Sequence, residues 1–310
     1  MSRAGSSRDT EDTGTDATHG LVVTHHGASV TVEDQAAILH PCHVRKRLGR
    51  VVCGDHVLWR RDKHGKGIVE ALQLRRTLLE RKDNFGRTKA LAANFDLLVI
   101  VSAPKPPLDE ELVDRYLIVA ECAPCRALIV VNKLDLLDAE AQQVLEERLQ
   151  PYIDIGVPVL FLSAHDTHTL EPLRDALHAS TSILLGQSGV GKSSLANALL
   201  PGKNIQIGML SAASGLGSHT TTSTVLYHLP QGGSLIDSPG VRDFQPSDLS
   251  SSDIERGFRE IAALNGQCRF HNCRHLEEPG CAVQIAAERG TISPRRLESY
   301  RRTWERRVNG

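Results

Sequence analysis

Long apolar runs, aromatic side chains and an excess of either charge are all scarce in this chain of 310 residues. No run of 18 or more apolar residues occurs, which argues against a membrane span. The N-terminus lacks the basic and then apolar pattern of a signal peptide, which argues against export. We therefore expect a cytoplasmic protein. Since no coiled-coil pattern or exposed apolar stripe stands out, we also expect a monomer.

Composition and length still allow two or three globular domains, because 40% of the residues are apolar. Residues 1–19 are polar and are predicted to be a disordered tail. After them, short β-like runs alternate with glycine-containing and charged turns, which predicts a small β-barrel over residues 20–83, of the OB-fold or SH3-like kind. The runs lie at 21–23, 28–33, 49–59 and 67–72.

Residues 84–245 have a different pattern, in which buried strands alternate with amphipathic helices. This alternation predicts an α/β domain with a parallel sheet covered by helices on both faces, and ligands bind at the carboxyl ends of such strands. Three of these strand ends carry polar motifs, NKLD, SAHD and GQSGVGKSS. Residues 246–310 are predicted to form a mainly helical metal-binding domain.

The segment GQSGVGKSS fits the phosphate-binding loop pattern G-x-x-x-x-G-K-[ST], with a predicted strand before it and a helix after it. Its glycines allow backbone N–H groups to surround phosphate oxygens, and the helix adds its positive N-terminal end. Lys192 is expected to reach the β- and γ-phosphates, and the Ser193 hydroxyl to bind Mg²⁺. The expected nucleotide-contacting residues of the loop are Gly186, Gln187, Ser188, Gly189, Val190, Gly191, Lys192, Ser193 and Ser194.

The base is predicted from NKLD, which comprises Asn132, Lys133 and Asp135 around a leucine. A carboxylate at Asp135 can accept two hydrogen bonds from guanine N1–H and N2–H₂, whereas adenine offers no such pair of donors. A site built on such bonds rejects the analogue that lacks them by roughly 10⁴ to 10⁵. SAHD, beginning with Ser163 and Ala164, is expected to supply a backbone N–H to guanine O6.

Further along, SLIDSPG places Asp237 at a strand end with Gly240 three residues later, the D-x-x-G arrangement. Asp237 is expected to hold Mg²⁺ through water, and the Gly240 N–H to sense the γ-phosphate. The segment SAASGLGSHTTTSTV before it indicates a switch. Thr221 is the favoured ligand that completes the Mg²⁺ shell, with Thr220 and Thr222 as alternatives.

The order of these motifs is unusual. Ordinary GTPases run from the phosphate loop to the switch threonine, D-x-x-G, NKxD and SA, whereas this chain begins with NKLD and SAHD and only then reaches the phosphate loop. Each motif keeps its own strand end, so the pattern indicates a circular permutation of a GTPase domain. The chain beyond Gly240 is then attached directly to the second switch.

The region after Gly240 contains a cluster of thiols and imidazoles. Cys268, Cys273, His275 and Cys281 have the spacing C-x4-C-x-H-x5-C, three thiolates and one imidazole as in tetrahedral structural zinc sites. His271 is an alternative fourth ligand. Cys122 and Cys125 also form C-x-x-C, but no second ligand pair lies near them, and we interpret the motif as coincidental. Cys42 and Cys53 are expected to be small side chains of the barrel.

Two basic segments flank the central domain. Twelve Lys or Arg residues against four acids lie between residues 45 and 82, and six arginines recur near the C-terminus. Such segments are usual on solvated surfaces, but they also make RNA phosphates a candidate partner. Trp59 is the one tryptophan of the barrel region, with Phe85 just beyond it, so recognition of RNA shape and backbone fits better than base stacking.

Apart from its first residues, the chain resembles the bacterial circularly permuted GTPases of the RsgA type, which depend on the small ribosomal subunit. The matching segments are ANFDLLVIVSA, DRYL, VNKLDLL, GQSGVGKSSLANALL, SGLGSHTTT, IDSPGVRDF and the cysteine–histidine cluster, all in the family's order. The resemblance implies an OB-fold barrel, a permuted GTPase domain and a zinc domain. It also implies GTP hydrolysis during late assembly of the small ribosomal subunit and its rRNA, stimulated by the subunit and followed by release.

The group that orients the attacking water is open. The position after D-x-x-G, often Gln, is Val241 here, and His219 before the threonines is the candidate. Arg242 is a weaker candidate for stabilising transition-state charge. Two alternatives remain, a GTP-sensing RNA scaffold with negligible hydrolysis and an assembly factor that uses ATP.

Overall fold

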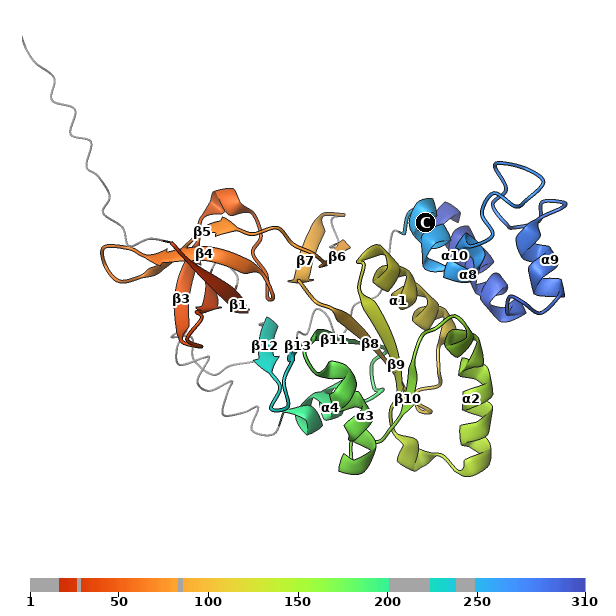
Figure 1. Cartoon of the computed structure of the whole chain (residues 1–310), viewed down its shortest axis with the longest axis horizontal. Coiled ribbons are helices and arrows are strands. Elements are labelled where there is room, and N and C mark those ends of the chain that lie inside the picture. The colour runs from red at the N-terminus through yellow and green to blue at the C-terminus, as the bar shows by residue number, and fades with distance from the viewer. Residues whose placement is uncertain (1–16, 27–28, 83–85, 201–223, 238–248, 310) are drawn as a thin grey trace, which may run out of the picture.

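The computed structural model describes residues 17–26, 29–82, 86–200, 224–237 and 249–309 (Figure 1). The predicted tail, apart from its last residues, lies outside this part of the chain. So do His219, Thr221 and Gly240, together with the alternatives Thr220, Thr222 and Arg242. No helix in the described ranges has both the length and the apolarity that crossing a bilayer requires.

A parallel sheet forms the centre of the molecule, in the strand order β10, β9, β8, β11, β13. Its strands are β8 (Leu97–Ser102), β9 (Arg126–Val131), β10 (Val159–Phe161), β11 (Thr181–Leu185) and β13 (Ser234–Asp237). An antiparallel strand, β12 (Thr224–His228), pairs with β13. The predicted sheet is present, with each motif-bearing strand in it.

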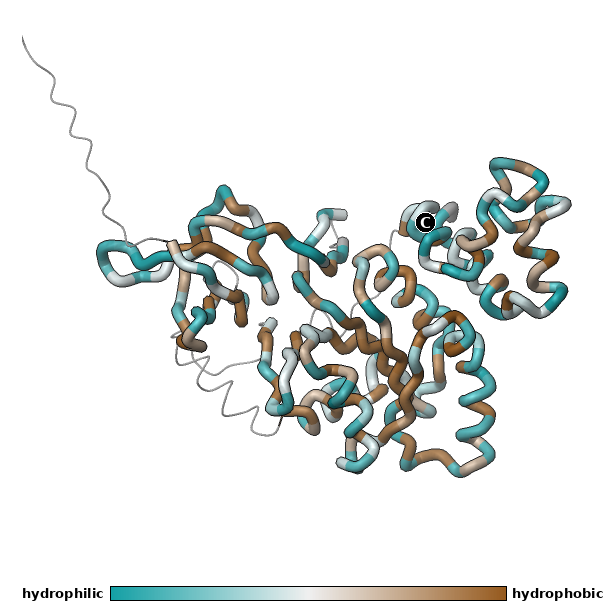
Figure 2. The backbone as a smooth tube through the Cα atoms, in the orientation of Figure 1, coloured by the Kyte–Doolittle hydropathy of each residue, from teal (hydrophilic) through white to brown (hydrophobic). Residues whose placement is uncertain are grey.

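Helices cover both faces of this sheet, and the strands are apolar on both sides for that reason. In β8, Leu98 and Ile100 pack toward α1 and α2, whereas Leu97 and Val99 pack toward α3 and α4. The helices are α1 (Glu110–Cys122), α2 (Ala139–Asp154), α3 (Glu171–Leu177) and α4 (Lys192–Leu199), with 3₁₀ turns η2 (Leu134–Leu136) and η3 (Thr167–Leu170). Figure 2 shows the hydrophobic residues concentrated along these central strands.

The N-terminal barrel has five strands and closes through pairing of β1 with β4. Its elements are β1 (Thr18–His26), β2 (Ser29–Glu33), β3 (Leu39–Val44), the 3₁₀ turn η1 (Lys46–Leu48), β4 (His56–Arg61) and β5 (Gly67–Leu72). Valines and Trp59 fill its interior. Gly20 is required there, because a Cβ would lie 2.3 Å from a methyl group of Val32.

The prediction of a strand over residues 49–59 is wrong for residues 49–55, because β4 begins at His56. The chain turns instead at Gly54, which has φ +90° and no room for a Cβ beside the Ala93 carbonyl oxygen. Asp55 holds the turn, because its buried carboxylate accepts from Val52 N–H at 2.7 Å and pairs with Arg75. The sequence analysis also missed β3, whose alternation is interrupted by Pro41, and the hairpin of β6 (Leu78–Lys82) and β7 (Thr88–Ala93).

One continuous sheet joins the barrel to the central domain. β12 pairs with β13 on one side and with β1 of the barrel on the other, with Thr24 opposite Val225. The buried Cys53 thiol donates to Val23 O at 3.0 Å, close to the same junction. His228 of β12 reaches Glu33 of β2 at 2.9 Å. β12 therefore connects the nucleotide-binding sheet and the barrel.

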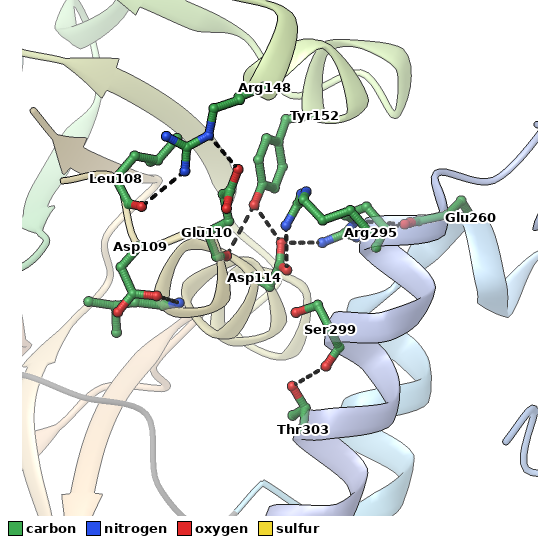
Figure 3. Close-up of polar contacts among 12 residues, drawn as sticks. Leu108, Asp109, Glu110, Asp114, Arg148, Tyr152, Glu260, Arg295, Ser299 and Thr303 are labelled. Atoms are coloured by element: carbon green, nitrogen blue, oxygen red, sulfur yellow. Dashed lines mark hydrogen bonds and ion pairs between the residues drawn. The ribbon is translucent and has the colours of Figure 1, made fainter. Parts of the chain in front are cut away.

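The C-terminal domain is helical and packs on α1 (Figure 1). Its helices are α7 (Ser251–Gly257), α8 (Arg259–Ala262), α9 (Ala282–Glu288) and α10 (Pro294–Asn309). Ser250 and Asp253 form a capping box at the start of α7, and Gly257 lies against Ile118 of α1, where a Cβ would be 2.4 Å from that side chain. A buried polar network crosses the same interface, in which Asp114 lies between Tyr152 and Arg295 (Figure 3).

Candidate functional site

The phosphate-binding loop connects β11 to α4, as its sequence predicts. Gly186 has φ +143°, and a Cβ there would lie 2.1 Å from Val101 O. Gly191, with φ +97°, would place a Cβ 2.2 Å from Asn132 Nδ2. Both glycines are required by close approach of neighbouring strand ends as well as by their backbone conformation. The loop is thus wedged between the ends of β8 and β9.

Lys192 is the first residue of α4 and its side chain is buried. Its ammonium group donates to Gly186 O at 2.6 Å and to Gln187 O at 2.8 Å, so it lies within the curve of the loop. Ser193 and Ser194, next on the helix, are exposed. The arrangement offers a buried cation and helix N–H groups in one concave turn, which is suited to a polyphosphate.

Asn132 ties two motifs together. Its amide group donates to Val190 O at 2.9 Å, and its carbonyl oxygen accepts from Ala164 N–H at 3.0 Å. The side chain is buried, so these bonds fix the phosphate loop against the strand end that carries SAHD. The Ala164 N–H therefore already has an acceptor in this structure.

Lys133 adds a second link to the phosphate loop. Its ammonium group donates to Gly189 O at 2.6 Å and to Lys105 O at 2.7 Å, and its own backbone is left-handed, with φ +65°. The sequence analysis assigned Lys133 to nucleotide contact but did not foresee this bracing role. The sequence signal for this role was the positive charge of Lys133, but no motif indicates that the Lys105 carbonyl oxygen accepts a hydrogen bond from it.

Asp135 lies in η2, exposed at the edge of the loop, and its Oδ1 accepts from the Ser163 hydroxyl. That bond is the largest cause that lowers the pKa of the Asp135 carboxyl below its usual value. The carboxylate is ionised at neutral pH and can accept hydrogen bonds. The sequence analysis did not foresee this contact, which orients Asp135 through the neighbouring motif.

Asp237 ends β13, at the same edge of the sheet as the phosphate loop, since β13 runs parallel to β11 with Ile236 opposite Ile183. The ends of β9, β10, β11 and β13 thus bring together Asn132, Ser163, Lys192 and Asp237. Residues that follow four strand ends thus lie at one edge of the sheet, although the outermost of them are separated by more than one hundred positions in the sequence.

A second site lies in the C-terminal domain. Ligand atoms of Cys268, Cys273, His275 and Cys281 all lie within 4.8 Å of one another, so this Cys₃His group could hold a metal ion. The His275 Nδ1 atom is 3.4 Å from Cys268 Sγ, 3.7 Å from Cys273 Sγ and 3.5 Å from Cys281 Sγ. His271, the alternative ligand, is exposed and is not in this group.

Neighbouring groups orient the ligand atoms of this cluster. His275 Nε2 lies 3.0 Å from Asn265 Oδ1, which fixes the ring so that Nδ1 faces the sulfurs. The Ala282 N–H donates to Cys268 Sγ at 3.3 Å. Burial raises the pKa of the Cys273 thiol to about 12, with the adjacent Cys268 and Cys281 adding to it. Only a bound cation would stabilise three thiolates at such close range.

The remaining cysteines lie outside the Cys₃His group. Cys42 and Cys53 are buried in the barrel region, where burial raises the pKa of each thiol. Cys122 and Cys125 belong to no metal-ligand group among the described residues. Burial raises the pKa of both thiols to about 12, so neither is an activated nucleophile.

Many side chains of the two basic segments form ion pairs with acids of the same chain. In the barrel, Glu70 accepts from Arg45 at 2.6 Å and from Arg60 at 2.9 Å. The exposed Arg47 also forms an ion pair with Glu70, at 3.7 Å, and Lys46 is exposed. Trp59 is buried and stacks on His40, so it is not available to nucleic acid bases. On α10, four of the six arginines pair with acids of this chain, namely Arg295, Arg296, Arg302 and Arg306.

Comparison with known proteins agrees with this geometry. A family model described as RsgA GTPase matches residues 72–247. Proteins from Haemophilus influenzae and Pseudomonas putida, both named small ribosomal subunit biogenesis GTPase RsgA, are 45% and 46% identical over 92% and 91% of this chain and 84% and 83% of theirs.

Solved structures are similar over nearly the whole length. The crystal structure of YjeQ from Thermotoga maritima, 29% identical, superposes with a TM-score of 0.78 over 95% of this chain and 99% of that one. YloQ, described as a circularly permuted GTPase, shares the fold with a TM-score of 0.75 over 97% of this chain and 98% of its own, at 24% identity. With motifs and fold in the same permuted order, the chain belongs to the RsgA GTPase family and is a circularly permuted GTPase.

Proposed function

We propose that this protein hydrolyses GTP to GDP and phosphate on the small ribosomal subunit during late assembly of that subunit, and then dissociates. The name shared by its relatives supports the partner. The observation that carries the nucleotide assignment is the bridge made by Asn132, which joins the phosphate loop to the SAHD turn through Val190 O and Ala164 N–H. The SAHD turn is thereby held at a set position relative to the phosphate-binding loop.

Each site residue takes a specific part in nucleotide binding. The phosphate loop and Lys192 hold the β- and γ-phosphates, and the Asp135 carboxylate accepts from guanine N1–H and N2–H₂. Ser193 and Thr221 bind the Mg²⁺ that bridges the phosphates, with Asp237 acting through water. When bound, Mg²⁺ neutralises charge that develops on the phosphate oxygens. Gly240 senses the γ-phosphate.

Asp237 and Ser193 are supported as residues of one metal site because Asp237 ends β13, and Ser193 is on α4 directly after the loop that follows β11, the strand paired with β13. For catalysis we assign His219 to orient the attacking water. Its position outside the described residues leaves this a proposal from the sequence. A switch histidine that is positioned only on the subunit would give a low intrinsic rate and a high stimulated rate.

The second metal is proposed to be Zn²⁺, held by Cys268, Cys273, His275 and Cys281. Three thiolates and one imidazole fill a tetrahedral shell, so the ion is structural and has no open position for catalysis. The barrel, residues 20–83, is proposed to contact rRNA through exposed Lys46 and Arg47. We further propose a cytoplasmic monomer, in which residues 84–245 bind GTP and residues 246–310 bind zinc.

Sedimentation with isolated small ribosomal subunits tests the proposal. The zinc-loaded protein is expected to sediment with subunits in the presence of Mg²⁺ and a non-hydrolysable GTP analogue, and to remain in the supernatant with GDP. A matched sample with large subunits controls for charge. Equal sedimentation with GTP analogue and GDP would contradict the release step, and equal binding to large subunits would contradict the partner.

A further inference from the structure

We propose that a hollow on the C-terminal domain binds one unstacked nucleotide of single-stranded RNA. It deepens the proposed function by naming a contact with rRNA. The hollow measures about 620 Å³ and lies between the metal-ligand loop, α7 and the end of α10. Its size is within the range of about 300–1,000 Å³ that is usual for small-ligand sites. Nothing in the GTPase chemistry uses it.

Unpaired cations line this hollow. Arg274 and Arg307 are on its wall and exposed, and Arg269 lies beside it with its guanidinium 5.5 Å from the Phe270 ring centroid. Within the described ranges of the chain, none of the three has an acidic partner. The contrast with α10 is informative, because most arginines of that helix are paired with acids, whereas Arg307 faces the hollow.

One carboxylate, that of Glu255, lines the hollow together with Arg274 and Arg307. Glu278 lies beside it, where its carboxylate accepts from the Arg274 backbone N–H at 2.8 Å. A divalent ion held by three thiolates would add a net charge of −1. The negative charges therefore equal the three guanidinium groups in number, but none of them pairs with a guanidinium group of the hollow in the described part of the chain. Guanidinium groups bind phosphate oxygens in a bidentate manner, so a phosphodiester fits this wall.

An exposed aromatic ring completes the site. Phe270 is 42% exposed and is the only aromatic residue among the exposed large apolar side chains in the described part of the chain. It lies in the loop between two metal ligands, Cys268 and Cys273, so metal binding would hold its position and reduce the entropy that binding costs. The free ring face and the Arg269 plane can stack on a base, and Asn272 and His271 offer polar groups to its edges.

These features favour a single-stranded nucleotide over other anionic partners. Bases inside a duplex are already stacked on one another and cannot reach an aromatic ring in a hollow. An acidic peptide would use the arginines, but it has no flat ring to stack on Phe270. The inference therefore needs both the charge and the ring, and each can be removed separately.

Photocrosslinking tests the contact with the full-length, zinc-loaded protein. The probe is a uridine decamer that carries 5-iodouridine at one position and a fluorescein label. We expect the crosslinked peptide to contain Phe270. Crosslinks confined to barrel peptides would overturn the inference.

Affinity measurements give the second test, by fluorescence anisotropy of the same decamer. Phe270→Ala is expected to weaken binding about 5- to 150-fold, the usual range for loss of one stacked base, and Phe270→Trp to restore it. Arg274→Ala and Arg307→Ala should each lower the slope of log affinity against log salt by about 0.7. Arg302→Ala is the control, since Arg302 is on α10 but paired with Glu298. Equal losses in Arg302→Ala and Arg307→Ala would contradict the site.

Competition separates RNA from acidic protein. Polyglutamate of matched charge is expected not to displace the decamer, and displacement as effective as that by unlabelled decamer would overturn the assignment to RNA. Failure here is distinct from failure of the proposed function. If subunits stimulate GTP turnover while Phe270→Ala binds the decamer normally, the hollow is refuted and the function is retained.

Discussion

Arg296 of α10 donates to Asp114 of α1 at 2.6 Å, and both side chains are almost completely buried at the boundary between the GTPase domain and the C-terminal domain. Glu260 accepts from the other side of the same guanidinium at 2.7 Å and 3.1 Å. Tyr152 donates to Asp114 at 2.7 Å and its ring lies near Arg295 (Figure 3). This charge network fixes the C-terminal domain to α1 and α2.

Removing the Arg296 guanidinium should lower the free energy of unfolding. Arg296→Met removes the buried cation that Glu260 and Asp114 share and leaves Asp114 only the longer contact with Arg295 at 3.4 Å, so we expect a loss of about 3–5 kcal/mol in the free energy of unfolding. The measurement is urea denaturation followed by the fluorescence of Trp304, which packs in the same core. Arg302→Met is the matched control, because its exposed pair with Glu298 contributes about 0.5 kcal/mol. Equal effects of the two variants would refute a structural role for the network.

Metal affinity should depend on Asn265, which fixes the His275 ring. Asn265→Ala is expected to weaken zinc binding about 10- to 100-fold, and Asn265→Asp to restore most of it, because the carboxylate also accepts from Nε2–H. Competition with a chromogenic chelator measures the affinity. Gln267→Ala is the control, because this residue is two positions away and its side chain donates to Ala263 O in the turn after α8. An unchanged affinity in Asn265→Ala would mean that the ring needs no such partner.

Nucleotide choice should depend on Asp135. Asp135→Asn replaces a double acceptor with a group that donates one hydrogen, so GTP affinity should fall sharply. Xanthosine triphosphate, which has an oxygen where guanine has its amino group, should bind better to the variant than to the parent. Calorimetric titration with GTP, ATP and xanthosine triphosphate checks this. Unaltered preference for GTP would contradict guanine recognition by Asp135.

The link between β12 and the barrel should depend on pH. His228 of β12 forms a hydrogen bond with Glu33 of the barrel, and this bond is the largest cause that raises the pKa of His228 above 6.5. The Ser234 hydroxyl contacts the other ring nitrogen of His228. Because the folded-state pKa is the higher one, the pair stabilises the fold fully below pH 6.5 and loses this effect as pH rises through the raised pKa. The difference in unfolding free energy between the parent and His228→Gln should therefore shrink from pH 6 to pH 9. A constant difference would show that His228 does not titrate with folding.

Catalysis should depend on His219. His219→Ala is expected to lose subunit-stimulated turnover while it retains affinity for GTP, because the histidine is assigned to the attacking water and not to the nucleotide. Steady-state turnover and equilibrium binding of a fluorescent GTP analogue separate the two. Arg242→Ala serves for comparison. If His219→Ala turns over GTP like the parent, the chain either uses another group or acts as a scaffold.

The sequence predicted where the motifs lie in the fold better than the contacts that hold them there. The phosphate loop, NKLD, SAHD and Asp237 were located because each short motif directly encodes a local backbone shape and a chemical role. Asp114 and Arg296 could not be paired from the sequence, since they are 182 positions apart and neither belongs to a motif. The arginines of α10 illustrate the difference, because their spacing made phosphates a candidate partner beside a solvated surface, whereas four of them pair with acids of the same chain.

The barrel shows the same limit. Its closed form followed from several short β-like runs, but β3 was missed because Pro41 interrupts its pattern, and residues 49–55 form a turn that depends on Gly54 and a buried Asp55. Pairing of β12 with β1 was also unpredicted, since strand pairing over 200 positions leaves no local signal.

The most direct test of the account is GTP and ATP turnover by the purified, zinc-loaded protein, with and without isolated small ribosomal subunits, at low and moderate salt. We expect slow GTP turnover by the free protein, strong stimulation by the subunit that salt weakens, and no turnover of ATP. GTP turnover that subunits leave unchanged would contradict the central claim that this GTPase is activated by the small ribosomal subunit.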